Sequence, residues 1–352
     1  MTASTTRGSN HVLEVRDLVV QFAGRGSWRH RRAVKAVDGV SFDIEKGEIL
    51  ALVGESGCGK STIALSVMRL LEPTSGRIIS GGEDLATLRG RALRRARRRV
   101  QMIFQDPFGS LNQRQTVYDT VVEPLVIHKL GTTPQERRAM VIEALDLAHL
   151  RPPERLASVY PHELSGGQRQ RVAIASAMVI RPELVIADEP VSMLDVSARA
   201  GILRLMMDLR DRLGTSYLFI THDLAVAWMV ADRIAVVYLG RIVEIGPATS
   251  LVDGPAHPYT KALLSVSSGD DVSEDGEITS VLSGETPSAA NVPSGCRFHP
   301  RCPRYLELGE PERCRAEDPQ LHVVRRRVPP SSEVYDANAH QCACHFAIEE
   351  AP

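Results

Sequence analysis

Apolar residues alternate with polar ones near the start of the chain and then gather in short uninterrupted runs. Residues 12–22 alternate, and Val40, Phe42 and Ile44 repeat the pattern, as expected of half-buried strands. Residues 49–53 read Ile-Leu-Ala-Leu-Val with no polar interruption. A run of this kind is typical of a central strand buried on both faces.

Similar runs recur later in the chain, separated by segments with helical spacing. Further buried strands are predicted at residues 184–188, 217–221 and 234–239. Helices are predicted at residues 60–71, 167–180, 196–213 and 223–231. Strands that alternate with helices indicate an α/β protein whose sheet is mainly parallel and covered by helices on both faces.

Two interruptions of this alternation suggest the domain organisation. The strand pattern disappears at about residues 112–165, where helical spacing predicts a helical subdomain inserted into the α/β core. Residues 266–293 are rich in Gly, Ser and acidic residues, which is typical of a linker. We therefore expect a domain at residues 1–265, this linker, and a Cys-rich C-terminal domain at residues 294–352.

Composition limits the classes of function. The chain has 352 residues, of which 43% are hydrophobic, so it can bury a large core. Its formal net charge of −1 provides no overall field for nucleic acid or an anionic membrane. No apolar run approaches the length of a membrane span, and the N-terminus lacks the apolar stretch of a signal peptide. A cytosolic chain is expected, with any membrane role arising through a partner subunit.

Residues 89–99 are rich in arginine, which bears on whether the chain binds nucleic acid. A nucleic-acid-binding patch and a contact with membrane-subunit loops are both possible interpretations. Leu88, Leu93 and Val100 interrupt the run, few aromatic residues accompany it, and the whole chain is not basic. These features favour a solvated helix face, and no nucleic-acid partner is expected.

Residues 54–61 form a glycine-rich turn of the type that binds phosphate. They read Gly-Glu-Ser-Gly-Cys-Gly-Lys-Ser and match G-x-x-x-x-G-K-[ST], with a buried strand before them and a helix after them. Glycines let successive N–H groups face phosphate oxygens, and the helix adds its positive N-terminal end. Lys60 can place a charge on the β- and γ-phosphates, and Ser61 can offer a hydroxyl to Mg²⁺. A glycine-rich turn that binds nothing is disfavoured by these flanking elements.

Polar side chains follow three further predicted strands at their carboxyl ends. Asp188 and Glu189 end one strand, Gln105 follows the apolar run 102–104, and His222 follows 217–221. Ligand sites of open α/β sheets lie at this edge. Asp188 can hold the Mg²⁺ shell and Glu189 can polarise an attacking water. Each residue alone could be an ordinary surface residue, so the prediction depends on the whole set.

A second anion-binding turn is predicted at Leu164-Ser165-Gly166-Gly167-Gln168, which precedes a helix. One nucleotide needs only one such turn. The second one therefore suggests that it serves the nucleotide of another chain.

Together these residues resemble the ATP-binding cassette (ABC) family over about residues 12–265. The resemblance implies an α/β P-loop NTPase fold, an ABC cassette with an antiparallel β N-terminal part and an inserted helical subdomain, followed here by the small Cys-rich tail. It also implies ATP and Mg²⁺ as cofactors, and two cassettes that meet head to tail. Each ATP then lies between residues 54–62 of one cassette and residues 164–168 of the other.

The same resemblance assigns roles to individual residues. The catalytic residues are expected to be Glu189, His222 and Gln105. The Mg²⁺ ligands are expected to be Ser61, Gln105 and Asp188. The other nucleotide-binding residues are expected to be Gly54, Ser56, Gly57, Gly59, Lys60, Thr62, Ser165, Gly166, Gly167, Gln168 and Asp195. For the aromatic residue that stacks on adenine, Phe22 is the first candidate and Trp28 the second.

The C-terminal part narrows the resemblance. Residues 255–264 and 293–303 resemble segments that mark the ATPases of oligopeptide and dipeptide importers, and Gln168 is similar to the F-type member of the ATPase pair. The implied function is ATP hydrolysis that powers import of peptides or similar small solutes. The implied partners are two transmembrane permease subunits, a second ABC ATPase subunit that is identical or different, and, indirectly, an extracytoplasmic solute-binding protein.

The chain would then sit peripherally on the cytoplasmic face of the cell membrane, held by the permease subunits. The alternatives are a soluble ABC ATPase acting on the ribosome or DNA, and an exporter ATPase. The single cassette, the lack of a heptad run and the importer-type tail favour the importer.

Five of the six cysteines lie in the C-terminal tail, and in a reducing cytosol such a cluster indicates metal or iron–sulfur ligation before disulfides. Zinc sites usually pair ligands that have two to four residues between them, and no gap between these cysteines has that length. Members of the importer family carry a [4Fe–4S] cluster in this tail. Carried over, the ligands are Cys296, Cys302, Cys314 and Cys344, with Cys344-His345 preferred over Cys342. A structural role is expected, while zinc or free thiols remain alternatives.

Overall fold

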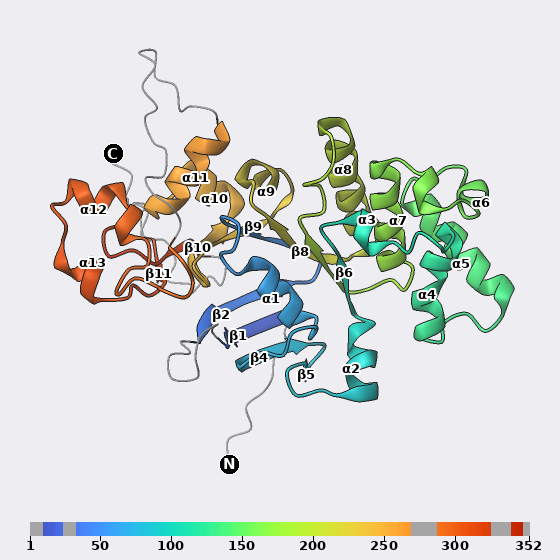
Figure 1. The fold of residues 1–352 in the computed structure, drawn as a ribbon, viewed down its shortest axis with the longest axis horizontal. Coiled ribbons are helices and arrows are strands. Elements are labelled where there is room, and N and C mark those ends of the chain that lie inside the picture. Colours follow the sequence, from blue (N-terminus) through green and yellow to red (C-terminus); the bar gives the residue numbers. More distant parts are fainter. Residues whose placement is uncertain (1–9, 24–32, 269–286, 325–338, 348–352) are drawn as a thin grey trace.

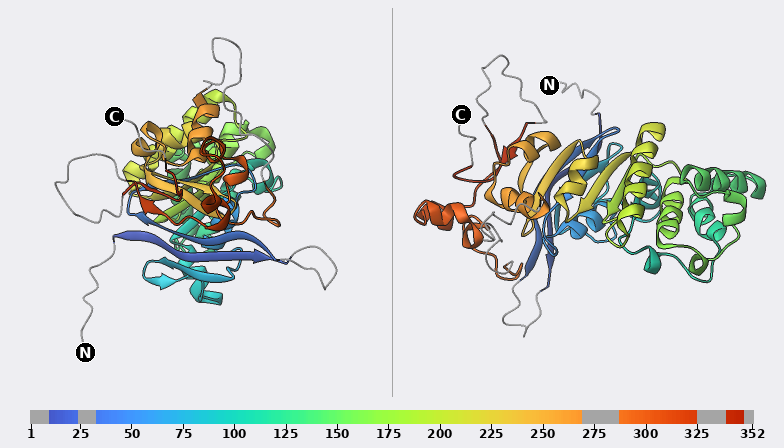
Figure 2. Two further views of the ribbon diagram at one scale, coloured as in Figure 1. Left: turned by 90° about the vertical axis from the view of Figure 1, so that its left-hand side faces the viewer. Right: turned by 90° about the horizontal axis from the view of Figure 1, so that it is seen from above.

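The computed structural model describes residues 10–23, 33–268, 287–324 and 339–347. Two sheets form its centre, helices extend from them on one side, and the C-terminal helices lie at the opposite end (Figure 1). Figure 2 shows the first two strands as a layer beside the larger sheet. The described part of the chain thus has a helical end, a mixed centre and a C-terminal end.

The smaller sheet is antiparallel and has the strand order β2-β1-β4-β5. Its strands are β1 His11–Phe22, β2 Val34–Glu45, β4 Ser75–Ser80 and β5 Glu83–Asp84. The buried side chains of β1 and β2 alternate with exposed ones, because successive residues of a strand point to opposite faces. One face of this sheet therefore packs on the rest of the protein.

The larger sheet has the order β11-β12-β10-β9-β3-β8-β7-β6. Its strands are β3 Ile49–Val53, β6 Val100–Ile103, β7 Leu184–Asp188, β8 Ser216–Thr221, β9 Arg233–Tyr238, β10 Arg241–Pro247, β11 His322–Val323 and β12 Gln341–Cys342. The run from β9 to β6 is parallel, and the strands beyond β9 are antiparallel. The predicted mainly parallel α/β sheet is confirmed.

Strand β3 is buried on both faces, as its apolar run predicts. Ile49, Ala51 and Val53 belong to one core, which includes most of the helices, while Leu50 and Leu52 belong to a second core with the smaller sheet and the helix at residues 60–67. Packing from both sides fixes the position of β3 and of the turn that follows it.

Helices cover the sheet and build the helical end. The longer ones are α1 Lys60–Val67, α2 Gly90–Arg97, α4 Val117–Ile127, α5 Pro134–Leu147, α7 Gly166–Met178, α8 Val196–Leu213, α9 Leu224–Val230 and α11 Pro258–Ser268. The short ones are α3 Pro107–Ser110, α6 Pro153–Leu156, η1 Pro161–Glu163, α10 Ala248–Asp253, η2 His299–Arg301, α12 Pro303–Glu307 and α13 Glu312–Ala316. Figure 2 shows α4 to α7 projecting away from the sheets.

Two predicted boundaries differ from the structure. The helix predicted at residues 60–71 ends at Val67, because Arg69 takes a left-handed backbone with φ 55° and Leu70 N–H donates to Leu65 C=O. The first residues of the linker predicted at 266–293 are helical, since α11 continues to Ser268. Residues 269–286 lie outside the described residues.

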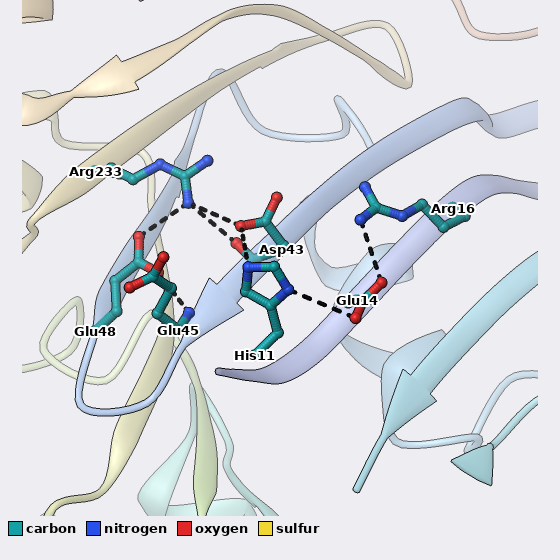
Figure 3. A network of polar contacts seen from close by, with 7 residues as sticks. All are labelled: His11, Glu14, Arg16, Asp43, Glu45, Glu48 and Arg233. Carbon is teal, nitrogen blue, oxygen red and sulfur yellow. Dashed lines mark hydrogen bonds and ion pairs between the residues drawn. The ribbon is translucent and has the colours of Figure 1, made fainter. Parts of the chain in front are cut away.

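An ion network joins β1 and β2 to the larger sheet (Figure 3). Arg233 Nη1 lies 3.0 Å from Glu48 Oε1 and 3.4 Å from Asp43 Oδ2, and only 8% of the Arg233 side chain is exposed. His11 Nε2 lies 3.5 Å from the same Asp43 carboxylate. Burial raises the pKa of Glu48, and the Glu45 N–H and Arg233 oppose that effect. Arg233 therefore compensates two carboxylates that the fold removes from water.

Arg233→Ala should lower the free energy of unfolding by about 2–3 kcal/mol, below the 3–5 kcal/mol typical of a fully buried pair because Asp43 is partly exposed. The pKa of Glu48 is raised in the folded state, so the folded state loses stability as pH rises through that pKa. At lower pH Glu48 becomes protonated and no longer needs the charge of Arg233, so the loss of unfolding free energy in Arg233→Ala should shrink as pH falls. Urea unfolding at several pH values measures this. Arg16→Ala is the control, since its pair with Glu14 is half exposed and should change stability by less than about 1 kcal/mol. Equal effects of both variants would contradict the interpretation.

Candidate nucleotide-binding site

The predicted phosphate-binding loop joins β3 to α1. Gly57 has φ 79° and Gly59 has φ 108°, a backbone conformation that L side chains rarely adopt. A Cβ on Gly59 would lie 2.4 Å from the Ala36 carbonyl oxygen, so the loop also packs too closely on β2 for a side chain there. The glycines are required by this turn, which leads directly into the N-terminus of α1.

Lys60 lies over this loop and is almost buried, with 5% of the residue exposed. Its Nζ donates to the carbonyl oxygens of Gly54 at 2.7 Å and Glu55 at 2.9 Å. The side chain is thus held by the main chain of the loop. A phosphate about 4 Å away would gain about 4 kcal/mol from this charge before desolvation at an effective dielectric of about 20.

Ser61 and Asp188 meet at the edge of the sheet. Ser61 Oγ donates to Asp188 Oδ1 at 3.2 Å, and Asp188 is 7% exposed at the end of β7. Burial raises the pKa of the Asp188 carboxyl, and the neighbouring Glu189 charge raises it further, while the Ser61 hydroxyl and Lys60 lower it. A bound cation would favour the ionised carboxylate, because opposite charge offsets desolvation. The hydroxyl and carboxylate oxygens fit Mg²⁺.

Glu189 receives contacts from two neighbouring strand ends. Gln105 Nε2 donates to Glu189 Oε2 at 2.9 Å, and His222 Nδ1 lies 3.2 Å from Glu189 Oε1. The backbone of Glu189 is left-handed, with φ 46°, and its N–H donates to Ile220 C=O at 2.9 Å. A non-glycine residue in this region stores strain of order 1–3 kcal/mol, and such residues occur at functional sites. The arrangement places a carboxylate where a water could be polarised.

These residues surround one pocket of about 560 Å³ at the carboxyl edge of the sheet. It is lined by Ala36, Ser56, Gly57, Gly59, Lys60, Ser61, Thr62, Gln105, Glu189, Ser192, Met193 and His222. Ala36 was not predicted, and the sequence holds no signal for it, because it contributes through the close approach of its main chain to Gly59. Gly54 and Asp188 contact the lining through Lys60 and Ser61.

The Ser-Gly-Gly turn stands apart from this pocket. The described residues that line it do not include Ser165, Gly166, Gly167 or Gln168. Instead, Ser165 begins α7: its Oγ accepts from Gln168 N–H at 3.2 Å, and Gln168 Oε1 accepts from Ser165 N–H at 3.0 Å. This reciprocal cap leaves Ser165 exposed and Gly166, Gly167 and Gln168 half-buried at a helix N-terminus.

Two other predicted residues also lie outside the lining. Asp195 caps α8, with Oδ1 accepting from Ala198 N–H at 2.9 Å. Phe22 ends β1 and is 42% exposed. Trp28 lies outside the described residues. The nucleotide-binding roles of these residues remain predictions.

The tail cysteines converge on a second, small cavity of about 10 Å³. Its lining includes Cys296, Cys302, Cys314 and Cys344, together with His257 and Phe298, whereas Cys342 is part of β12. Burial raises the pKa of Cys296 to about 11 and of Cys344 to about 12. Four thiols on one cavity suit a soft metal centre in donor chemistry. As placed, however, no three His, Cys, Asp or Glu side chains of the described residues form a metal-binding group.

Comparison with known proteins gives the family. Residues 37–192 match the model of the ABC transporter family, and residues 243–307 match that of the oligopeptide/dipeptide transporter C-terminal region. A dimeric ATP-binding cassette solved in a post-hydrolysis state with ADP and phosphate is 29% identical, with a TM-score of 0.60, covering 67% of this chain and 98% of that one. The predicted ABC cassette fold and ATPase class are confirmed.

Full-length relatives extend the match through the tail. The oligopeptide transport ATP-binding protein AppF of Bacillus subtilis is 44% identical over 348 residues, which are 97% of this chain and 99% of the relative. The di/tripeptide transport ATP-binding protein DppF of Pseudomonas aeruginosa is 43% identical over 338 residues, covering 96% and 98%. The chain belongs to the ABC transporter family of ATP-binding proteins, whose activity is ATP hydrolysis.

Proposed function

We propose that this chain hydrolyses ATP to power the import of peptides or similar small solutes through a membrane ABC transporter. The observation that carries the proposal is similarity over nearly the whole chain to peptide-transport ATP-binding proteins, the C-terminal region included. The pocket supports it, because the phosphate loop and the Gln105–Glu189–His222 group line the same space. An ATPase acting on the ribosome or DNA has no comparable support.

The proposed chemistry uses few residues. Lys60 and the loop N–H groups would bind the phosphates, and Ser61 and Asp188 would hold Mg²⁺, which would offset the phosphate charge. Glu189 polarises the attacking water and takes up its proton, while Gln105 and His222 fix the carboxylate on either side. Gln105 would also reach Mg²⁺, and His222 the γ-phosphate.

The Ser165–Gln168 turn is proposed to close over the nucleotide of a second cassette. Its position outside the chain's own pocket and at a helix N-terminus supports this assignment. The turn then supplies N–H groups to an anion that its own chain does not hold. Asp195, at the start of the adjacent α8, would lie near the same interface.

The proposed partners are two transmembrane permease subunits and a second ATPase subunit, with a solute-binding protein acting from outside the cell. No helix within the described residues has the length and hydrophobicity to cross a bilayer. The chain would therefore reach the cytoplasmic face of the membrane through the permease subunits.

Co-purification tests this function. Tagged chain extracted from membranes with detergent should bring down two membrane subunits and an ATPase partner, and the assembly should hydrolyse ATP faster when its binding protein carries a peptide. Sedimentation with ribosomes or DNA, and not with membranes, would contradict the proposal.

For the tail, we infer that Cys296, Cys302, Cys314 and Cys344 hold a [4Fe–4S] cluster with a structural role. Their convergence on one cavity supports this ligand set, and the thiols would have to lose their protons and draw apart to admit the cluster.

Iron analysis tests the cluster. Protein purified without oxygen should be brown and contain about four iron and four sulfide per chain. Cys344→Ala should lose most of the iron, whereas Cys342→Ala should keep it because Cys342 does not line the cavity. Colourless protein loaded with zinc, or equal iron loss in both variants, would contradict it.

A further inference from the structure

The C-terminal tail contacts the phosphate-binding loop, although the two segments are far apart in the sequence. Arg301, in the η2 segment His299–Arg301, places Nη1 3.0 Å from Glu55 Oε2 and Nη2 3.1 Å from Glu55 Oε1. The Arg301 side chain is 6% exposed and that of Glu55 22%. Two parallel charge-assisted hydrogen bonds fix orientation as well as distance. Glu55 is the second residue of the loop, so a tail residue holds the loop directly.

An aromatic cluster fixes the tail segment in place. Phe298 is 1% exposed, and its ring centroid lies 5.3 Å from those of Tyr238 and Tyr259. The Tyr259 hydroxyl accepts from Glu55 N–H at 3.0 Å. Tyr259, against which the tail packs, thus binds the main chain of Glu55, and Arg301 of the tail binds its side chain.

The far end of the loop is held from the same segment. Arg297 donates to the Leu239 carbonyl oxygen and pairs with Asp38. The next residue, Gly240, donates its N–H to Cys58 C=O at 2.8 Å and accepts from Asp38 N–H at 2.9 Å. Arg301 therefore contacts the start of the loop at Glu55, and Arg297 contacts Leu239 and Asp38, which hold Gly240 beside Cys58 of the loop.

The Glu55 carboxylate lies in a place where its charge matters. Lys60, the cation expected to meet the phosphates, donates to the main-chain oxygen of Glu55 at 2.9 Å. Paired with Arg301, the carboxylate is neutralised and held in the tail contact. Without Arg301, the Glu55 carboxylate would lose the cation that offsets its charge beside a loop that must accept a polyanion.

We propose that Arg301 is a positioning residue for nucleotide binding, which acts through Glu55 to hold the phosphate-binding loop open to ATP. The kinetic test of this inference rests on the proposed function, because it measures ATP hydrolysis, whereas the binding test does not. The tail is then part of the ATP site's support, and Arg301 directly precedes Cys302 of the thiol cavity, so the folding of the tail and the affinity for ATP are linked.

A double-mutant cycle on the full-length chain tests the proposal. Arg301→Ala should raise the Kd for Mg·ATP about tenfold, which corresponds to about 1.4 kcal/mol. Glu55→Gln should also raise Kd, because an amide cannot accept both Arg301 hydrogen bonds, and added to Arg301→Ala it should cause little further loss because both changes break the same contact. Arg301→Lys should be intermediate, since it keeps the charge without the two-pronged geometry.

Steady-state kinetics separates positioning from mere stability. Arg301→Ala should raise KM for ATP and leave kcat at saturation nearly unchanged, the pattern expected when a binding interaction is lost. Arg313→Ala is the matched control, because its tail ion pair with Glu317 is exposed and should leave Kd at the wild-type value.

An unchanged Kd in Arg301→Ala, or losses that simply add in the double variant, would overturn the inference. Should Arg301→Ala fail to fold, a wild-type Kd in folded Arg301→Lys and Glu55→Gln/Arg301→Lys would overturn it equally. Absence of ATP turnover in the wild-type assembly would instead count against the proposed function and leave the Kd comparison valid.

Discussion

Glu189→Gln is expected to leave Mg·ATP binding intact while ATP turnover falls by about 10²–10⁴-fold, the usual contribution of a positioned general base. The introduced amide keeps the size of the carboxylate and can still contact Gln105 and His222, whose side chains lie 2.9 Å and 3.2 Å from the Glu189 carboxylate in the wild type. It cannot take a proton from water. Filter binding and phosphate release, measured on the same preparation, separate the two effects.

Glu183→Gln is the matched control for this variant. Glu183 is exposed and directly precedes β7, the strand that ends at Asp188, so the same chemical change occurs away from the pocket. Its turnover should equal that of the wild type. Turnover of Glu189→Gln near the wild-type rate would show that another group, with His222 the nearest, polarises the water.

The pocket could be predicted from the sequence because its main residues follow strands. Asp188 ends a strand that is buried on both faces, and Gln105 follows the parallel neighbour of that strand, so the two side chains reach the same edge of the sheet. The phosphate loop was predicted from its glycines, which the positive φ angles of Gly57 and Gly59 explain. Local rules were sufficient wherever a residue's role depends on its own strand or turn.

Contacts across the fold could not be predicted in this way. Arg301 and Glu55 are 246 positions apart, and neither residue carries a local pattern that names the other. Ala36 lines the pocket through its main chain, and Arg69 ends α1 without the glycine that would have signalled it. Such features arise from packing, which the spacing of apolar residues does not specify.

The tail illustrates the same limit. The sequence predicts a structural role for a cluster bound by the tail cysteines, yet Phe298 and Cys296 belong to the large core of the protein. Strands β11 and β12 also extend the larger sheet beyond β10. The described part of the tail is thus stabilised by packing and strand pairing with the cassette. A ligand of the thiols would add to this stability.

Lys60→Ala carries the second large expected effect. Lys60 is nearly buried over the loop and has its charge available to a phosphate, so its removal should cost about 2–5 kcal/mol of Mg·ATP binding, or roughly thirtyfold or more in Kd. Lys46→Ala is the control, because Lys46 is exposed and does not line the nucleotide pocket. Circular dichroism should show all three proteins folded.

Equilibrium dialysis of the folded full-length chain against Mg·ATP tests the central claim most directly. The wild type and Lys46→Ala should retain nucleotide with the same affinity, and Lys60→Ala should retain almost none at the same concentration. If the wild type fails to bind Mg·ATP, or if Lys60→Ala binds it as well as the wild type does, residues 54–61 do not form the nucleotide site.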